Sequence, residues 1–199
     1  MTDIKFIRLN CLLNLSNKDK TEELIKSAKE LVSKTLSNDE GVEDYDLFQS
    51  QTNPNKFLIF ETWKNQTNLS AHMNKDHFKS AVPIIQKLGE MKIEQINVGK
   101  ENPKTFKLIR MNCPLEVKNG KEEEVLKDAV ELVNKSLKDE GVVDYDILKS
   151  CTRNNQFLIF ETWKNQDCLN KHMNSEHFKK LVPKIQENGN LKIDQLFIV

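Results

Sequence analysis

FLIFETWKNQ occupies residues 57–66 and returns without a single change at 157–166. Three shorter matches lie around it in the same order in both halves of the chain: IRLNC at 7–11 with IRMNC at 109–113, EGVEDYD at 40–46 with EGVVDYD at 140–146, and HMNKDHF at 72–78 with HMNSEHF at 172–178. A long period with only two copies indicates duplication and fusion of one small domain rather than a solenoid.

The repeat predicts two modules, residues 1–99 and 106–199, joined by a linker at 100–105. The sequence at this junction, GKENPKT at 99–105, contains Gly, Asn and Pro, which are typical of a connecting segment. A domain of about 95 residues is near the lower end of independently stable sizes. We expect the modules to pair within one chain, because fusion raises the effective concentration of each half for the other. A further homodimer of whole chains is compatible with this scheme.

Apolar periodicity predicts the same series of elements in each module. In the first, we expect a helix at 21–36, a short helix that begins at 68–71, and a next helix capped by Asn74 with a kink or restart at Pro83. We expect strands at 5–13, 43–51, 56–64 and 91–98. The order is β-α-β-β-α-β, the ferredoxin-like arrangement of an α+β fold. Its helices cover one face of the sheet. We expect the other module to cover the second face, which gives a dimeric α+β barrel within one chain.

The stretch ETWKNQTNLSAHMNKDHF contains an acid, a Trp, a polar turn, a His and a second His five residues later. Together with GVEDYD before the second strand, this pattern resembles the antibiotic biosynthesis monooxygenase (ABM) family. The resemblance covers nearly the whole of each module. Among family members, the chain is similar to the small quinol-oxidising monooxygenases.

The resemblance implies an oxidoreductase: a cofactor-independent monooxygenase whose partners are a small phenol or quinol and dioxygen. In that chemistry the deprotonated substrate supplies electrons to dioxygen, and the protein binds the ring, assists proton removal and stabilises oxyanions. Haem-degrading members also use a first-strand Asn, like Asn10, but need a Trp and a His where this chain has His72 and Val82. No cofactor is therefore expected. The family is mixed in function, so a non-catalytic small-molecule-binding or stress-associated protein, or an isomerase, are alternatives.

Polar residues in the first strand are candidates for the site. Arg8 and Asn10 are two apart and share one face of the sheet, where buried polar groups need partners. Arg8 could bind an anionic oxygen and Asn10 could donate to an oxyanion. Alternatively, Arg8 forms a buried ion pair with Glu61 on the neighbouring third strand.

The two histidines are five residues apart, which on a continuous helix leaves them roughly 140° apart. No metal pair is therefore predicted. One histidine could be a general base, or both could be helix-junction residues bonded to backbone.

Trp63 and Tyr45 could stack on a substrate or pack under a helix. The predicted catalytic residues are Asn10, His72, Asn112 and His172. The predicted substrate-binding residues are Arg8, Tyr45, Trp63, His77, Arg110, Tyr145, Trp163 and His177.

Composition excludes several other classes of protein. Lys and Arg together number 30, as do Asp and Glu, so the basic surplus of a nucleic-acid binder is missing. There is no apolar run long enough for a membrane span, and the start lacks the apolar core of a signal peptide, so a cytoplasmic location is expected. The four cysteines form no CxxC pair, which predicts neither a disulfide framework nor a zinc site.

Overall fold

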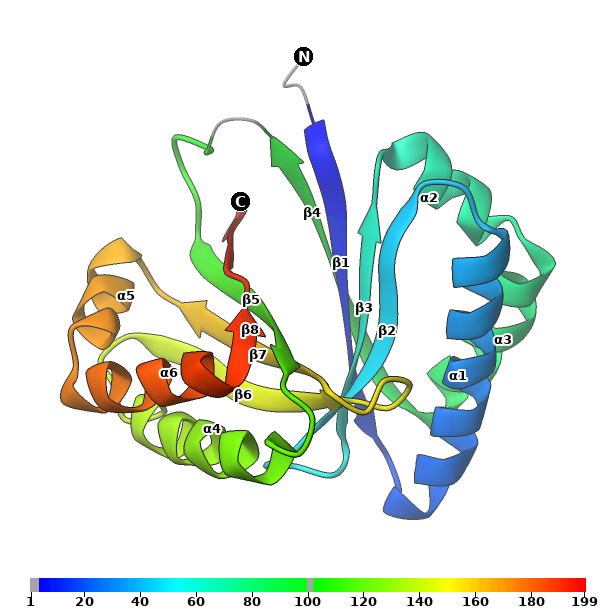
Figure 1. Cartoon of the computed structure of the whole chain (residues 1–199). Helices are drawn as coiled ribbons and strands as arrows, with labels where there is room; N and C mark the ends of the chain where they lie inside the picture. The colour runs from blue at the N-terminus through cyan, green and yellow to red at the C-terminus, as the bar shows by residue number, and fades with distance from the viewer. Residues whose placement is uncertain (1–3, 100–101) are drawn as a thin grey trace. The chain divides into compact units, whose positions relative to one another are not determined.

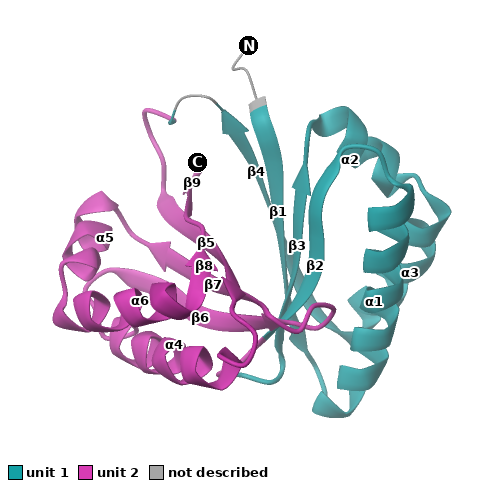
Figure 2. Cartoon of the chain, in the orientation of Figure 1, with its two compact units in different colours: residues 1–49, 53–102 teal, residues 50–52, 103–199 magenta. Residues whose placement is uncertain are grey.

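The computed structural model describes residues 4–99 and 102–199 (Figure 1). The chain divides into two compact units, residues 1–49 with 53–102 and residues 50–52 with 103–199 (Figure 2). The predicted linker includes residues 100 and 101, which lie outside the described part, so the module boundaries stay a prediction. The face-to-face pairing of the halves also stays a prediction.

The first module has the predicted β-α-β-β-α-β order, with its second helical region divided in two. Its elements are β1 (Ile4–Leu15), a 3₁₀ turn (Lys18–Lys20), α1 (Thr21–Asn38), β2 (Val42–Ser50), β3 (Lys56–Trp63), α2 (Gln66–Met73), α3 (Asp76–Leu88) and β4 (Gly89–Gly99). The strands lie in the order β4-β1-β3-β2, and each pair is antiparallel. The ferredoxin-like α+β prediction is confirmed.

Apolar side chains four and three residues apart explain how α1 packs on the sheet. Leu24, Ala28, Leu31 and Val32 are all buried, while Lys and Glu fill the opposite side of the helix. Hydrophobic burial of this stripe, rather than helix propensity, holds the helix in place. None of the described helices is both long and apolar enough to cross a membrane.

The strand register assigns each polar residue of the sheet to one face. Leu9 lies opposite Glu61, which in turn lies opposite Tyr45 on β2, so these three side chains share a face. They line a cavity together with residues of the helices, which identifies this as the helix-covered face. Arg8 and Asn10 alternate with Leu9 and therefore point to the other face. Both are nonetheless buried.

The connection between α2 and α3 falls at Asn74 and Lys75, where the sequence predicts that a new helix begins. The Asn65 side chain caps α2 by accepting a hydrogen bond from the Asn68 N–H at 3.0 Å. The helix ends at Met73, and α3 begins at Asp76 after a short break. α3 then continues through Pro83 without a restart. The break changes the relation between His72 and His77, on which the exclusion of a metal pair depended.

The second module repeats the first except at its sheet edge. Its elements are β5 (Leu108–Val117), α4 (Glu122–Ser136), β6 (Val142–Ser150), β7 (Gln156–Trp163), α5 (Gln166–Met173), α6 (Glu176–Asn188), β8 (Gly189–Leu191) and β9 (Asp194–Ile198). Within this module the order is β6-β7-β5, and β8 and β9 both pair with β5.

A proline explains why the last strand is split in the second module. Pro114 occupies the position that Leu12 holds in β1. The Lys192 N–H donates to the Pro114 carbonyl at 2.8 Å, but proline has no N–H with which to return the bond. Pairing stops at Leu191 and resumes at Asp194. The opposite edge of β5 keeps its unbroken register with β7.

Candidate functional site

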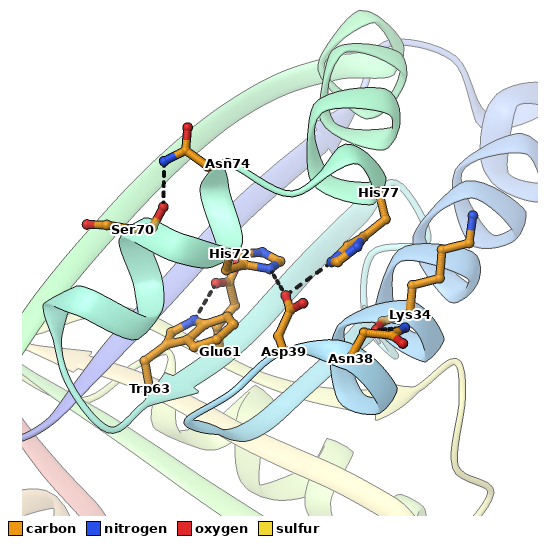
Figure 3. A network of polar contacts seen from close by, with 9 residues as sticks. All are labelled: Lys34, Asn38, Asp39, Glu61, Trp63, Ser70, His72, Asn74 and His77. Carbon is orange, nitrogen blue, oxygen red and sulfur yellow. Dashed lines mark hydrogen bonds and ion pairs between the residues drawn. The ribbon is translucent and has the colours of Figure 1, made fainter.

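A buried glutamate lies at the centre of the helix-covered face of the first module. The Glu61 side chain extends from β3, and the residue is 3% exposed. Its Oε2 accepts a hydrogen bond from the Trp63 indole Nε1 at 2.9 Å, as Figure 3 shows. Its Oε1 accepts a weaker one from the Cys11 thiol at 3.8 Å. The carboxyl group is therefore held in place by side chains of two neighbouring strands.

Burial changes the protonation chemistry of this group. Removal from water raises the pKa of Glu61 to about 7, although hydrogen bonds from Trp63, Tyr45 and Cys11 favour the charged form. Burial, together with the negative charge of Glu61, raises the pKa of Tyr45 and of Cys11 well above their ordinary values. Near neutral pH, Glu61 can therefore either accept or donate a proton, while Tyr45 and Cys11 keep theirs.

A second polar cluster joins the end of α1 to the junction of α2 and α3. His72 Nδ1 lies 2.5 Å from Asp39 Oδ2, and His77 Nε2 lies 3.1 Å from the same oxygen (Figure 3). The His72 ring packs against Trp63, with 4.7 Å between ring centroids. Burial lowers the pKa of His72, although its contact with Asp39 acts in the opposite direction. The cluster thus positions the indole that bonds to Glu61.

A cavity of about 140 Å³ lies between the sheet and the helices of the first module. Leu9, Tyr45 and Glu61 line it from the sheet, and Phe78 and Val82 line it from α3. A dry cavity of roughly 150 Å³ holds one benzene-sized ring. The cavity is therefore the size of a single aromatic ring, and the Glu61 carboxyl is in its wall.

Arg8 and Asn10 do not join this cavity, because they lie on the opposite face of the sheet. The Arg8 guanidinium carbon lies 4.0 Å from the centroid of the Phe60 ring, a cation–π contact. The register places Arg8 opposite Thr62, so the alternative of an Arg8–Glu61 ion pair is wrong. The predicted set thus separates into Arg8 and Asn10 on one face, and Tyr45, Trp63, His72 and His77 on the other.

The second module repeats both clusters. Trp163 Nε1 donates to Glu161 Oε2 at 2.8 Å, and burial raises the pKa of Glu161 to about 7. His172 Nδ1 and His177 Nε2 lie 2.7 and 2.9 Å from Asp139 Oδ2. Tyr145 lies opposite Glu161, as Tyr45 lies opposite Glu61. On the other face, Arg110 lies over the Phe160 ring and donates to the Thr162 hydroxyl, and Asn112 is fully buried.

The sequence predictions did not include Glu61 and Asp39 among the site residues. Each carries a signal that is visible in the sequence. Glu61 directly follows four apolar residues at 57–60, and its copy does the same at 161. Asp39 precedes Glu-Gly after the first helix and returns as Asp139 before the same pair. A repeated polar residue beside a buried element indicates a role that needs a partner.

Comparison with known proteins places the chain in a family. The model of the antibiotic biosynthesis monooxygenase family matches residues 16–83 and 109–184. The chain belongs to the ABM family. The two matched stretches correspond to the two modules, so the chain carries two ABM domains in tandem.

Three relatives illustrate matches about one module long. YcnE of Bacillus subtilis is 32% identical over 80 residues, which cover 40% of this chain and 84% of the length of YcnE. Its name assigns YcnE provisionally to the monooxygenases. Among solved structures, a conserved protein of unknown function from Bacteroides thetaiotaomicron is 43% identical and covers 46% of this chain and 95% of its own, with a TM-score of 0.44. A conserved protein from Methanosarcina mazei is 27% identical, with coverage of 48% and 94% and a TM-score of 0.45.

Proposed function

We propose that this chain is a cofactor-independent monooxygenase that oxidises a one-ring phenol or quinol, with Glu61 as the base. The observation that carries the proposal is an apolar, ring-sized cavity whose wall contains a carboxyl group with a pKa near 7. Membership of the ABM family supports the reaction class. Glu161 has the corresponding role in the second module.

The reaction starts with proton removal. The substrate hydroxyl donates its proton to the Glu61 carboxylate, and the resulting phenolate transfers an electron to dioxygen. One oxygen atom enters the ring, a ring C–H becomes a C=O, and the second oxygen atom leaves as water. The substrate supplies all four electrons that reduce dioxygen, so the electron count balances without a cofactor. A base with a pKa near the working pH is the most effective kind for such a step.

The neighbouring residues position the base. Trp63 and Cys11 hydrogen bond to the two oxygens of Glu61, which fixes the direction of its lone pairs. His72 supports the Trp63 ring from the α2 side. We therefore assign His72 to positioning rather than to proton removal, because it is not among the residues that line the cavity. Arg8 and Asn10 have no assigned role here, since they lie on the other face.

Oxygen uptake with a panel of one-ring quinols and phenols tests this function. The wild-type chain should consume oxygen, and with ¹⁸O₂ the product should gain one labelled atom. Glu61→Gln combined with Glu161→Gln should lower kcat by a factor of roughly 10² or more, since general-base catalysis contributes about that much. Each single variant should keep about half of the activity if both modules work.

Two results would contradict the proposal. The first is absence of oxygen uptake across the panel. The second is uptake that the double glutamine variant leaves unchanged. Binding of ring compounds without oxygen uptake, seen as a rise in Tm, would favour a non-catalytic binding protein or an isomerase that uses the same cavity.

A further inference from the structure

The clusters at Asp39 and Asp139 contain the donor set of a transition-metal site. Each has two imidazole nitrogens and a carboxylate oxygen, and in each module these three atoms all lie within 4.8 Å of one another. Imidazole and carboxylate together suit zinc and neighbouring divalent metals. Tetrahedral ligands of zinc are roughly 3.3 Å apart. The nitrogen–oxygen distances of 2.5–3.1 Å around Asp39 therefore need to widen by less than about 1 Å.

The break between α2 and α3 creates this convergence. On one continuous helix, His72 and His77 would point in different directions. Because α2 ends at Met73 and α3 starts at Asp76, the two rings approach the same Asp39 oxygen from different helices (Figure 3). The third donor comes from the C-cap position of α1. An ion here would tie three helices of the module together.

The charge balance of the cluster also points to a cation. The Asp39 side chain is 2% exposed, and among the described residues it has no lysine or arginine partner. Its second oxygen, Oδ1, is buried and has no hydrogen-bond partner within the described part of the chain. A buried carboxylate oxygen without a donor is costly. A divalent ion bound at the three donors would lie beside this carboxylate and neutralise it.

A groove gives an ion access to the cluster from solvent. A cavity of about 490 Å³ between α1 and α3 is lined by His77 together with Glu30, Lys34, Asp76 and Ser80. The His77 side chain is 11% exposed, whereas His72 is fully buried. His77 therefore connects the buried donors with the groove, where water could complete the coordination shell. Lys34, which forms an ion pair with Glu30 at 2.7 Å, balances one of the two groove carboxylates, and Asp76 is the other.

We propose that Asp39, His72 and His77, and equally Asp139, His172 and His177, form two sites for a divalent transition-metal ion of the zinc type. The sites are separate from the Glu61 cavity and do not depend on the proposed monooxygenase activity. The rival explanation is a metal-free His–Asp–His hydrogen-bond cluster, which has the same residues at similar distances. The two explanations differ in metal stoichiometry, so binding measurements separate them.

The experiment uses the full chain after chelation and dialysis. Titration with Zn²⁺ by calorimetry and elemental analysis should give two ions per chain, and Co²⁺ should produce visible d–d absorption of a low-coordinate site. His77→Gln should remove one of the two ions, and His77→Gln with His177→Gln should remove both. Bound Zn²⁺ should also raise Tm in the wild type and not in the double variant.

Two control variants make the outcome decisive. Glu30 lines the groove but is not one of the three ligands, so the Glu30→Gln variant should still bind two ions per chain. Cys151→Ser with Cys168→Ser removes two thiols that could take up zinc adventitiously, and it too should keep both. Asp39→Asn with Asp139→Asn should weaken Zn²⁺ binding at least tenfold. Fewer than one ion per chain, or binding that the double histidine variant leaves unchanged, would overturn the proposal.

Discussion

The two modules keep the same interior while their sheet edges differ. The Glu–Trp pair and the Asp–His–His cluster recur with distances that agree within a few tenths of an ångström. The last strand, by contrast, is continuous as β4 and split into β8 and β9 in the copy. The difference teaches that the Glu–Trp pair and the Asp–His–His cluster are built from β3, the end of α1 and the α2–α3 junction. The edge strand can change without moving these parts.

The largest expected effect is the loss of either tryptophan. Trp63→Ala and Trp163→Ala each empty a fully buried position and remove the indole donor to a buried glutamate. We expect each to cost about 3–5 kcal/mol of unfolding free energy. Urea unfolding should show similar losses for the two. Trp63→Phe, which keeps a ring but loses the N–H, should cost less. A loss below 1 kcal/mol in one module would show that the two interiors are not equivalent.

The buried glutamates should make stability fall as pH rises. In the folded state the pKa of Glu61 and of Glu161 is raised from 4.5 to about 7, so the folded chain holds these protons more tightly. The resulting stability is fully present below pH 4.5 and is lost as pH rises through 7, by about 3 kcal/mol per site.

Glutamine variants isolate this effect from other titrating groups. Glu61→Gln cannot ionise, so its unfolding free energy relative to the wild type should rise between pH 5 and pH 8. Glu161→Gln should show the same trend if the modules are alike, and urea unfolding at several pH values measures both. A difference that does not change with pH would mean that the carboxyl group is not titrating in this range.

The aspartates offer a comparison in which we expect the modules to differ. The Asp39 side chain is 2% exposed and that of Asp139 is 21% exposed. In metal-free buffer, Asp39→Asn should cost about 2 kcal/mol because buried charge-assisted hydrogen bonds are lost, and Asp139→Asn about 1 kcal/mol because water can replace them. Thermal unfolding of both variants checks the order. The reverse order would show that exposure does not set the strength of these bonds.

The smallest expected effect is at the sheet edge. Pro114→Leu restores an N–H that can donate to the Lys192 carbonyl, and it should add about 1 kcal/mol of stability. Hydrogen exchange should then show slower exchange across residues 189–198. The matched change Leu12→Pro should act in the opposite direction on β4. If Pro114→Leu leaves exchange unchanged, the split of the last strand has another cause.

Much of the fold could be predicted from the sequence because local signals and the repeat agree. Apolar periodicity located the helices and strands, and the second copy supplied an independent check of each. The break between α2 and α3 was predicted from Asn74, a residue type typical of a helix cap, but the angle between His72 and His77 was judged along one continuous helix. That break decided whether His72 and His77 could meet, so the exclusion of a metal pair rested on the wrong helix geometry.

The sequence by itself determined the duplication, the ferredoxin-like order of each module and the family, since these depend on residue identity and spacing along one chain. Only the tertiary structure decided which polar residues meet. Strand register placed Arg8 and Asn10 on one face and Glu61 on the other, a choice that a shift of one residue would reverse. The same packing buried Glu61 and raised its pKa, because desolvation depends on what surrounds a carboxyl group in space and not on its neighbours in sequence.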